Sequence, residues 1–217
     1  MNQKYAFLQA LIVAIVIFSA GLFLGIYFEN LRVQNTQDNL YQSDIDLNDF
    51  QAASQLAFHS NLSCDKITQK SVYFADQIYS EMIRLEKEDS SNRLTERFLP
   101  VHRRYDLLRT ILWKDIIENK ALCKSNLNTV IYMYNYSNPS LDLKGIQSTI
   151  SNYIGDLKNK YGDNIILIPI AADTELDFVD LMREKYNLTT IPVVLVNEQY
   201  KVDNLDYLKT IEEHLNK

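Results

Sequence analysis

The stretch TVIYMYNYSNPSLDLKG, residues 129–145, changes its hydrophobic pattern partway along. Its side chains first alternate between two faces, with Val130, Tyr132 and Tyr134 on one of them, which is typical of a strand. The polar turn Ser-Asn-Pro follows, and the residues after it favour a helix. A strand that leads directly into a helix predicts an α/β unit.

The chain after this stretch continues to alternate between strands and helices. A helix from about Leu141 to Tyr161 precedes the apolar strand DNIILIPI, and a second helix, capped by Asp173, precedes the strand IPVVLVN. The short NEQ turn leads into one more strand, and an amphipathic helix closes the chain. Residues 128–217 therefore predict the order β-α-β-α-β-β-α, in which the first two strands are parallel and the last two antiparallel.

This element order, together with the loop YNLTTIPVVLVNEQYKV, resembles the thioredoxin-like fold. In that family a proline in the corresponding loop is cis and faces a Cys-x-x-Cys motif at the first strand-to-helix junction. The resemblance assigns the proline loop to Thr190, Ile191 and Pro192. With the segments that precede it, the whole chain is similar to small membrane-anchored thioredoxin-like proteins of prokaryotes, and an archaeal source is expected.

Four residues without a thiol replace the family's cysteine pair at that junction: Asn138, Pro139, Ser140 and Leu141. An amide or an aliphatic side chain forms neither a thiolate nor a mixed disulfide. The resemblance therefore implies a domain without disulfide-exchange activity, whose surface near the proline binds a peptide or protein segment. The residues of that candidate binding surface are Tyr136, Asn138, Ile191 and Pro192.

Residues 6–28 carry no charge and exceed the about 20 apolar residues that span a bilayer. They predict a membrane anchor; the alternative, a cleaved signal peptide, usually has a shorter apolar core. Lys4 precedes the anchor and acidic residues follow it, which predicts a cytoplasmic amino terminus and a body outside the cytoplasm. Gly21 and Gly25 form a G-x-x-x-G, which fits a homodimer through anchor and stalk, although single glycines are also tolerated in membrane helices.

Residues 29–127 read as helices. Apolar residues recur every seven positions from Val33 to Leu47, which indicates a coiled-coil-like stalk that leaves the membrane. A second helix is expected to begin at a polar cap in residues 61–63. A third is expected to run to Cys123, with Pro100 in its first turn.

Cys64 and Cys123 are the only two cysteines. They lie at adjacent ends of the second and third helices if these form an antiparallel hairpin, and outside the cytoplasm such a pair should form a disulfide. A bridge that closes a loop of about 60 residues stabilises a fold by roughly 4 kcal/mol in the entropic model. The alternatives are two free buried thiols in a reducing compartment, or an exposed redox-active pair.

The chain has 22 basic and 28 acidic residues and a net charge of -6, which argues against binding of nucleic acid. His59, His102 and His214 have no metal-binding spacing, and surface positions are expected for them. No phosphate-binding or hydrolase motif occurs. The sequence therefore predicts no cofactor and no metal site.

The expected organisation is a cytoplasmic tip and anchor over residues 1–28, a helical stalk and hairpin over 29–127, and a thioredoxin-like α/β domain over 128–217. Three hypotheses for function remain open. The first is a membrane-anchored protein that binds or scaffolds protein or peptide segments. The second is a thiol–disulfide oxidoreductase that uses Cys64 and Cys123, and the third is a purely structural envelope protein.

Overall fold

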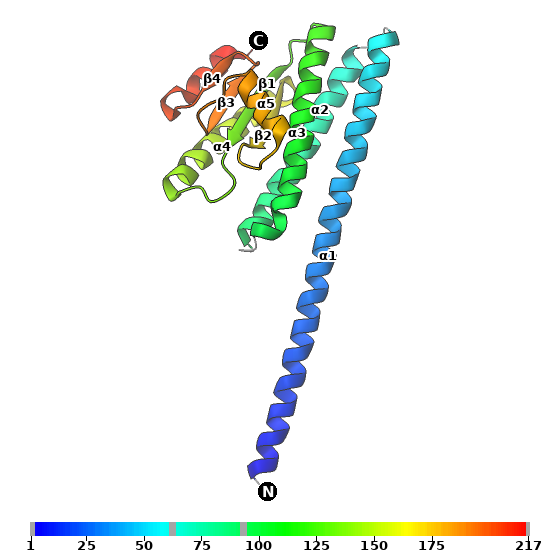
Figure 1. Cartoon of the computed structure of the whole chain (residues 1–217), viewed down its shortest axis with the longest axis vertical. Coiled ribbons are helices and arrows are strands. Elements are labelled where there is room, and N and C mark those ends of the chain that lie inside the picture. Colours follow the sequence, from blue (N-terminus) through cyan, green and yellow to red (C-terminus); the bar gives the residue numbers. More distant parts are fainter. Residues whose placement is uncertain (1–2, 61–63, 92–94, 216–217) are drawn as a thin grey trace. The chain divides into compact units, whose positions relative to one another are not determined.

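The computed structural model describes residues 3–60, 64–91 and 95–215. The chain divides into two compact units, Met1–Gln42 and Ser43–Lys217. The first unit contains most of one long helix, α1, which spans Gln3–Ser60. The second unit contains the end of α1 and all later elements (Figure 1). The two helices that follow α1 therefore belong to the same unit as the sheet.

In the first unit, Phe7–Leu31 of α1 is long and apolar enough to cross a membrane, and none of it is buried against other described residues. Phe7, Phe18 and Phe23 are each at least 70% exposed. A helix with this bare apolar surface fits a single-pass membrane anchor, and a signal sequence has the same properties. The direction in which the helix crosses a membrane stays a prediction.

Two further helices follow α1 in the second unit. α2 spans Cys64–Ser91 and α3 spans Thr95–Cys123. The predicted cap of α2 in residues 61–63 lies outside the described residues. The prediction that Pro100 occupies the first turn of α3 is wrong, because α3 begins at Thr95 and Pro100 lies inside the helix. Its missing N–H leaves one carbonyl of the preceding turn without a helical donor.

The end of α1 packs along α3 in the second unit. Leu47, the last residue of the predicted heptad pattern, is only 4% exposed. The Gln51 side chain donates a hydrogen bond to Asp115 Oδ2 at 2.8 Å, and Asp44 forms an ion pair with Arg104. The heptad pattern therefore marks a packed face of this part of α1.

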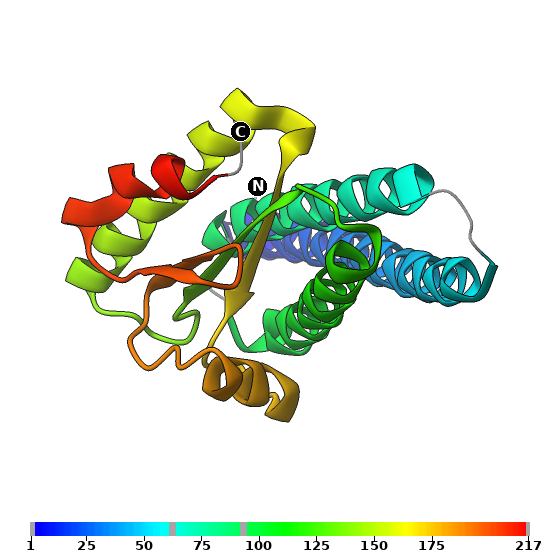
Figure 2. The same ribbon diagram turned by 90° about the horizontal axis from the view of Figure 1, so that it is seen from above.

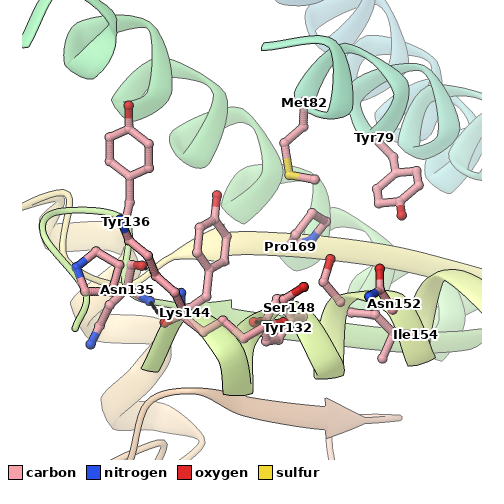
Figure 3. A pocket seen from close by; sticks show the side chains of 14 residues that line it. Tyr79, Met82, Tyr132, Asn135, Tyr136, Lys144, Ser148, Asn152, Ile154 and Pro169 are labelled. Carbon is pink, nitrogen blue, oxygen red and sulfur yellow. Dashed lines mark hydrogen bonds between the residues drawn. The ribbon is translucent and has the colours of Figure 1, made fainter. Parts of the chain in front are cut away.

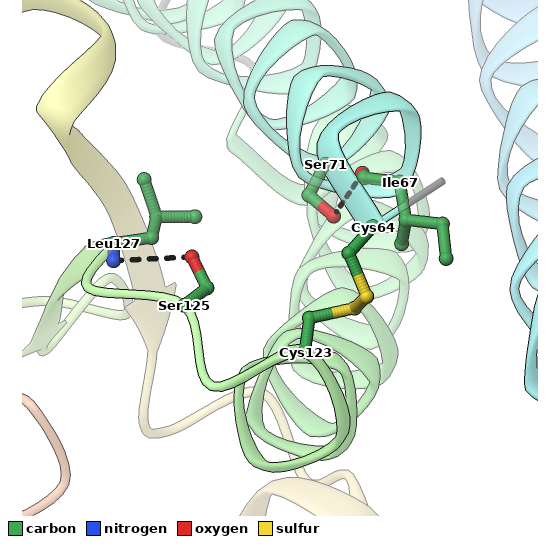
Figure 4. Close-up of a disulfide and its surroundings, with 6 residues drawn as sticks. All are labelled: Cys64, Ile67, Ser71, Cys123, Ser125 and Leu127. Atoms are coloured by element: carbon green, nitrogen blue, oxygen red, sulfur yellow. Dashed lines mark hydrogen bonds between the residues drawn. A yellow bond between two sulfur atoms is a disulfide. The ribbon is translucent and has the colours of Figure 1, made fainter. Parts of the chain in front are cut away.

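A disulfide joins the first residue of α2 to the last residue of α3 (Figure 4). The Cα atoms of Cys64 and Cys123 lie 5.5 Å apart, which is within the usual range for a bridge. The predicted disulfide between these two helices is therefore confirmed. Both cysteines are partly exposed.

The sheet has four strands in the order β2-β1-β3-β4. β1 (Asn128–Tyr134) is parallel to β2 (Ile165–Ala171), and the crossover helix α4 (Leu141–Tyr161) connects them. β3 (Val193–Val196) is antiparallel to β1 and to β4 (Tyr200–Val202). The predicted strand directions are confirmed. The last element is a 3-10 helix, η2 (Leu205–His214), rather than the predicted α-helix.

The apolar residues of η2 have a spacing that is compatible with its 3-10 winding. Leu205, Leu208 and Ile211 recur every third residue, which matches the three residues per turn of a 3-10 helix. Leu208 and Ile211 are buried.

The two faces of the sheet carry different helices (Figure 2). Val130, Tyr132 and Tyr134 of β1 share one face, where a buried apolar cluster joins them to residues of α4 and η2. Ile131 and Met133 point to the opposite face and are fully buried. α3 and α5 (Asp177–Lys185) pack against each other on that side. α2 packs against β2 at the edge of the sheet.

Candidate binding pocket at the carboxyl end of β1

A pocket with a volume of about 410 Å³ lies between α2, α4 and the carboxyl ends of β1 and β2 (Figure 3). We call it the tyrosine pocket. It is lined by Tyr79, Met82, Tyr132, Tyr134, Asn135, Tyr136, Pro139, Lys144, Gln147, Ser148, Ser151, Asn152, Ile154 and Pro169. Ligands of open α/β sheets usually bind outside the carboxyl ends of the strands, which is where this pocket opens.

Aromatic and apolar side chains form the inner surface of the tyrosine pocket. Tyr132 and Tyr134 project from the same face of β1, and their rings stack with centroids 5.5 Å apart. The Tyr132 hydroxyl donates a hydrogen bond to the Gln147 carbonyl at 3.1 Å, which attaches the strand to α4. Ile154 and Pro169 are buried beside them. This surface offers aromatic and apolar contacts to a ligand.

Two antiparallel helices form the walls of the tyrosine pocket. Lys158 of α4 forms an ion pair with Asp76 of α2 at 2.6 Å. One turn away, the Tyr79 hydroxyl lies 3.7 Å from the position that a Cβ atom of Gly155 would occupy. A Cβ atom at position 155 would therefore make an ordinary contact with the Tyr79 hydroxyl, which places this part of α2 beside α4. Further along α4, Ser148 also has a small side chain, which leaves room for the pocket.

The loop between β1 and α4 forms one end of the tyrosine pocket and is held by two side chains. Gln147 accepts a hydrogen bond from the Asn135 backbone N–H and donates one to the Asn135 carbonyl, both at 3.0 Å. The Asp173 carboxylate accepts hydrogen bonds from the N–H groups of Tyr136 at 2.8 Å and Ser137 at 2.7 Å. These charge-assisted bonds fix the position from which the Tyr136 ring projects.

The prediction that Asp173 caps the following helix is wrong. α5 begins at Asp177, and its N-cap is Leu176, whose side chain makes no capping bond. The carboxylate of Asp173 instead accepts two N–H groups of a loop that is distant in the sequence. The local sequence cannot distinguish a carboxylate that caps a helix from one that binds a distant loop, because in both cases it accepts hydrogen bonds from free backbone N–H groups.

His102 of α3 lies behind Tyr136, and its ring stacks on the Tyr136 ring with centroids 4.0 Å apart. The expected surface position of His102 is wrong, since the residue is only 1% exposed. Neither ring nitrogen has a hydrogen-bond partner among the described residues. Burial lowers the pKa of His102 to about 4, and the nearby charge of Arg109 contributes to the decrease. The imidazole is therefore neutral at pH 7.

A buried ion pair on α3 supplies hydrogen bonds to the edge strand β2. Arg109 donates to Asp106 Oδ1 at 2.9 Å and to the Pro169 carbonyl at 3.2 Å. Asp106 Oδ1 also accepts the Ala171 N–H at 3.1 Å. Alternate residues of a strand direct their backbone groups to the same side. The Pro169 carbonyl and the Ala171 N–H therefore both face α3, whose two side chains bind them as a neighbouring strand would. Proline is tolerated here because an edge position needs no ladder donor.

Burial affects the charge of this ion pair. Asp106 and Arg109 are 0% and 1% exposed. Burial raises the pKa of Asp106 to about 7, although the Arg109 charge and the Ala171 N–H favour the carboxylate. The sequence analysis did not identify these residues, because an Asp and an Arg three positions apart on a helix usually form an exposed pair. One indication of burial was present in the sequence, because position 109 falls on the apolar side of α3.

The structure brings together some of the predicted site residues and separates others. Tyr136 and Pro139 line the tyrosine pocket, whereas the other predicted site residues do not. Ser140 is the N-cap of α4 and accepts the Leu143 N–H. Asn138 is exposed with a φ of 52°, and Leu141 is 86% exposed.

The proline loop lies on the other side of β1. The Ile191–Pro192 peptide bond is cis, and Pro192 is buried. Met133 and Val193 form the last antiparallel pair of β1 and β3, and Pro192 directly precedes Val193. β3 and β2 flank β1 on opposite sides. The pocket and the proline loop are therefore neighbouring surfaces at the same end of the sheet.

The disulfide lies at the opposite end of β1 from both surfaces. Cys123 ends α3 shortly before Asn128, the first residue of β1, whereas the pocket opens beyond Tyr134. Seven residues of strand cover about 20 Å. The bridge is therefore remote from the tyrosine pocket and from Pro192.

The described residues that line the tyrosine pocket offer hydroxyls, amides and one ammonium group, without cysteine, histidine or carboxylate. Among the side chains that the structure describes, no group of three or more His, Cys, Asp or Glu could hold a metal ion. No protein-family model matches the sequence, and no curated protein matches it significantly.

Proposed function

We propose that this protein is a membrane-anchored binding module that holds a protein or peptide segment in the tyrosine pocket. The observation that carries the proposal is the pocket itself, with a volume of about 410 Å³, an aromatic inner surface and a polar rim. Its volume is in the range of ligand sites, and the mixture of apolar lining with a few polar groups is typical of them.

The arrangement of elements supports a thioredoxin-like domain as the carrier of this pocket. β1, α4 and β2 form a parallel unit, and an antiparallel hairpin of β3 and β4 follows. The junction between β1 and α4 contains no thiol. We therefore propose binding without disulfide exchange, on the extracytoplasmic side of the membrane. The disulfide between Cys64 and Cys123 agrees with an oxidising compartment.

The rim of the tyrosine pocket supplies a matched pair of variants to test binding. Ser148 and Thr149 are neighbouring exposed residues of α4, but only Ser148 lines the pocket. Ser148→Trp should fill the pocket, whereas Thr149→Trp adds the same side chain to a different face of the helix. Both variants should retain the fold, because both positions are solvent-accessible.

The test is fluorescence anisotropy with the full chain in lipid nanodiscs and an array of labelled decapeptides. Some peptides should bind to the wild-type chain and to Thr149→Trp with equal affinity, and at least tenfold more weakly to Ser148→Trp. Equal binding to all three chains, or no binding to any of them, would contradict the proposed function. Circular dichroism of each variant checks that the fold is intact.

The partly exposed disulfide favours a second candidate function, thiol–disulfide exchange by Cys64 and Cys123. Its distance from the tyrosine pocket argues against that role. An insulin-reduction assay on the wild-type chain and on Cys64→Ser/Cys123→Ser distinguishes the two. The binding module should show no activity in either form, and activity that disappears in the double variant would establish the oxidoreductase.

A further inference from the structure

One wall of the tyrosine pocket carries a row of polar side chains from a single face of α4. Lys144, Ser148, Ser151 and Asn152 are spaced as neighbours on successive helical turns. Their side chains make no hydrogen bond or ion pair with other residues in the described part of the chain. The opposite wall carries Met82, which is 4% exposed. The pocket therefore has a polar side with free hydrogen-bonding groups and an apolar side.

Among the described residues that line the tyrosine pocket, Lys144 is the only charged one. None of the acidic side chains that the structure describes forms an ion pair with its ammonium group, although the whole chain has a net charge of -6. A ligand with a negative charge at this end of the pocket would be attracted to it, and a ligand with a positive charge would not.

The helix geometry places the charge at a defined distance from the apolar side. Asp76 of α2 pairs with Lys158 of α4, and the Tyr79 hydroxyl lies beside Gly155. α2 therefore advances toward the amino end of α4, and we expect Met82 to lie nearest to Asn152, which lines the same pocket. Lys144 is eight residues earlier in α4, which corresponds to about 12 Å along the helix. An extended peptide covers this distance in three or four residues.

We propose that the tyrosine pocket selects an extended peptide segment in which an acidic side chain lies three or four residues from an apolar one. The acidic side chain pairs with Lys144, and the apolar side chain packs between Met82 and the tyrosine rings. The exposed rim at Lys144, Ser148 and Asn152 lets a continuous chain enter from the side. The selectivity rests on the proposed function, since it concerns the same pocket.

The test compares two sets of labelled decapeptides that differ only in one side-chain group, a carboxylate in the first set and an amide in the second. Each peptide carries Leu or Tyr together with Glu three or four positions away, and its partner carries Gln in place of Glu. The full chain in nanodiscs should bind the Glu peptides about two- to fivefold more tightly at low salt, which is the usual strength of an exposed ion pair. The difference should decrease as the ionic strength rises.

Variants of two exposed lysines identify the group that is responsible. Lys144→Gln should abolish the preference for Glu. Lys70→Gln, on α2 and outside the pocket, should leave the preference unchanged. Equal affinity of the wild-type chain for Glu and Gln peptides, or a preference that survives in Lys144→Gln, would overturn the charge selectivity alone. Absence of binding to every peptide would overturn the proposed function as well.

Discussion

The imidazole ring of His102 stacks on the phenol ring of Tyr136, with centroids 4.0 Å apart and planes inclined by 30°. This contact joins the buried face of α3 to the wall of the tyrosine pocket. Asp106 and Arg109 lie on the following turns of α3, and the charge of Asp173 acts on Asp106 from the end of β2. Protonation of this buried group of residues should therefore affect the stability of the unit that contains the pocket.

His102 should make the protein less stable as the pH falls. Its pKa is about 4 in the native state and 6.5 in the unfolded chain, so between these values only the unfolded chain binds the proton. The free energy of unfolding then rises with pH, by up to about 1.4 kcal/mol per pH unit. His102→Phe retains the ring stack and removes this titration. Its stabilisation relative to wild type, measured by urea unfolding, should increase from pH 6.5 to pH 4.

Asp106 should have the opposite pH dependence. Burial raises its pKa from 3.8 to about 7, so between these values the native state binds a proton that the unfolded chain lacks. The free energy of unfolding then falls as the pH rises. Asp106→Asn should therefore become more stable relative to wild type from pH 4 to pH 7. A difference that stays constant over this range would show that Asp106 is already ionised beside Arg109.

Asp173 should hold the loop that carries Tyr136. Asp173→Ala removes the acceptor of two backbone N–H groups, at 2.8 and 2.7 Å, and should lower the free energy of unfolding by about 1–3 kcal/mol. Hydrogen exchange of the Tyr136 and Ser137 amides should become faster. Asp177→Ala, an exposed residue in the first turn of α5, is the control. Unchanged protection of both amides in Asp173→Ala would refute the role.

The disulfide should stabilise the second unit through its long loop. Cys64 and Cys123 are 59 positions apart, and removal of a native bridge typically costs about 2–5 kcal/mol. Cys123→Ser should lower the midpoint of thermal unfolding, and reduction of the wild-type chain should have a similar effect. Because the bridge is remote from the tyrosine pocket, peptide affinity at 25 °C should stay the same. A selective loss of affinity in the folded variant would contradict the separation of the two sites.

The orientation in the membrane follows from Lys4 before the anchor and the acidic residues after it. Protease added to intact cells that express the full chain should remove residues 43–217, and the amino-terminal tip should stay protected. A body that is degraded only after the membrane is opened would reverse the orientation. That result would also remove the support that an oxidising compartment gives to the disulfide.

Patterns that are local in the sequence predicted much of the fold. The alternation from Val130 to Tyr134 predicted β1, and the long crossover predicted its parallel pairing with β2. The bridge between Cys64 and Cys123 followed from the arrangement of two helices. These features depend on periodicity and on chain connectivity, which one sequence contains.

The tyrosine pocket could be predicted only in part, because one of its walls comes from a distant segment. Tyr136 and Pro139 were identified from the loop that carries them, but Tyr79 and Met82 of α2 were not. Their place opposite α4 depends on the packing of α2 against β2, which no local pattern indicates. His102 was expected at the surface for a similar reason, since its burial requires β2 and the β1–α4 loop to cover α3.

The central claim is that a peptide segment lies between α2 and α4, and photo-crosslinking tests it most directly. A peptide that binds in the array is made again with a benzophenone side chain at its apolar position, bound to the full chain and irradiated. Mass spectrometry of the digested product then locates the new covalent bond. The account predicts a bond at Met82 or Tyr79 that is lost in Ser148→Trp and kept in Thr149→Trp. A bond at Ile191 or elsewhere in the proline loop, with none on α2, would contradict it.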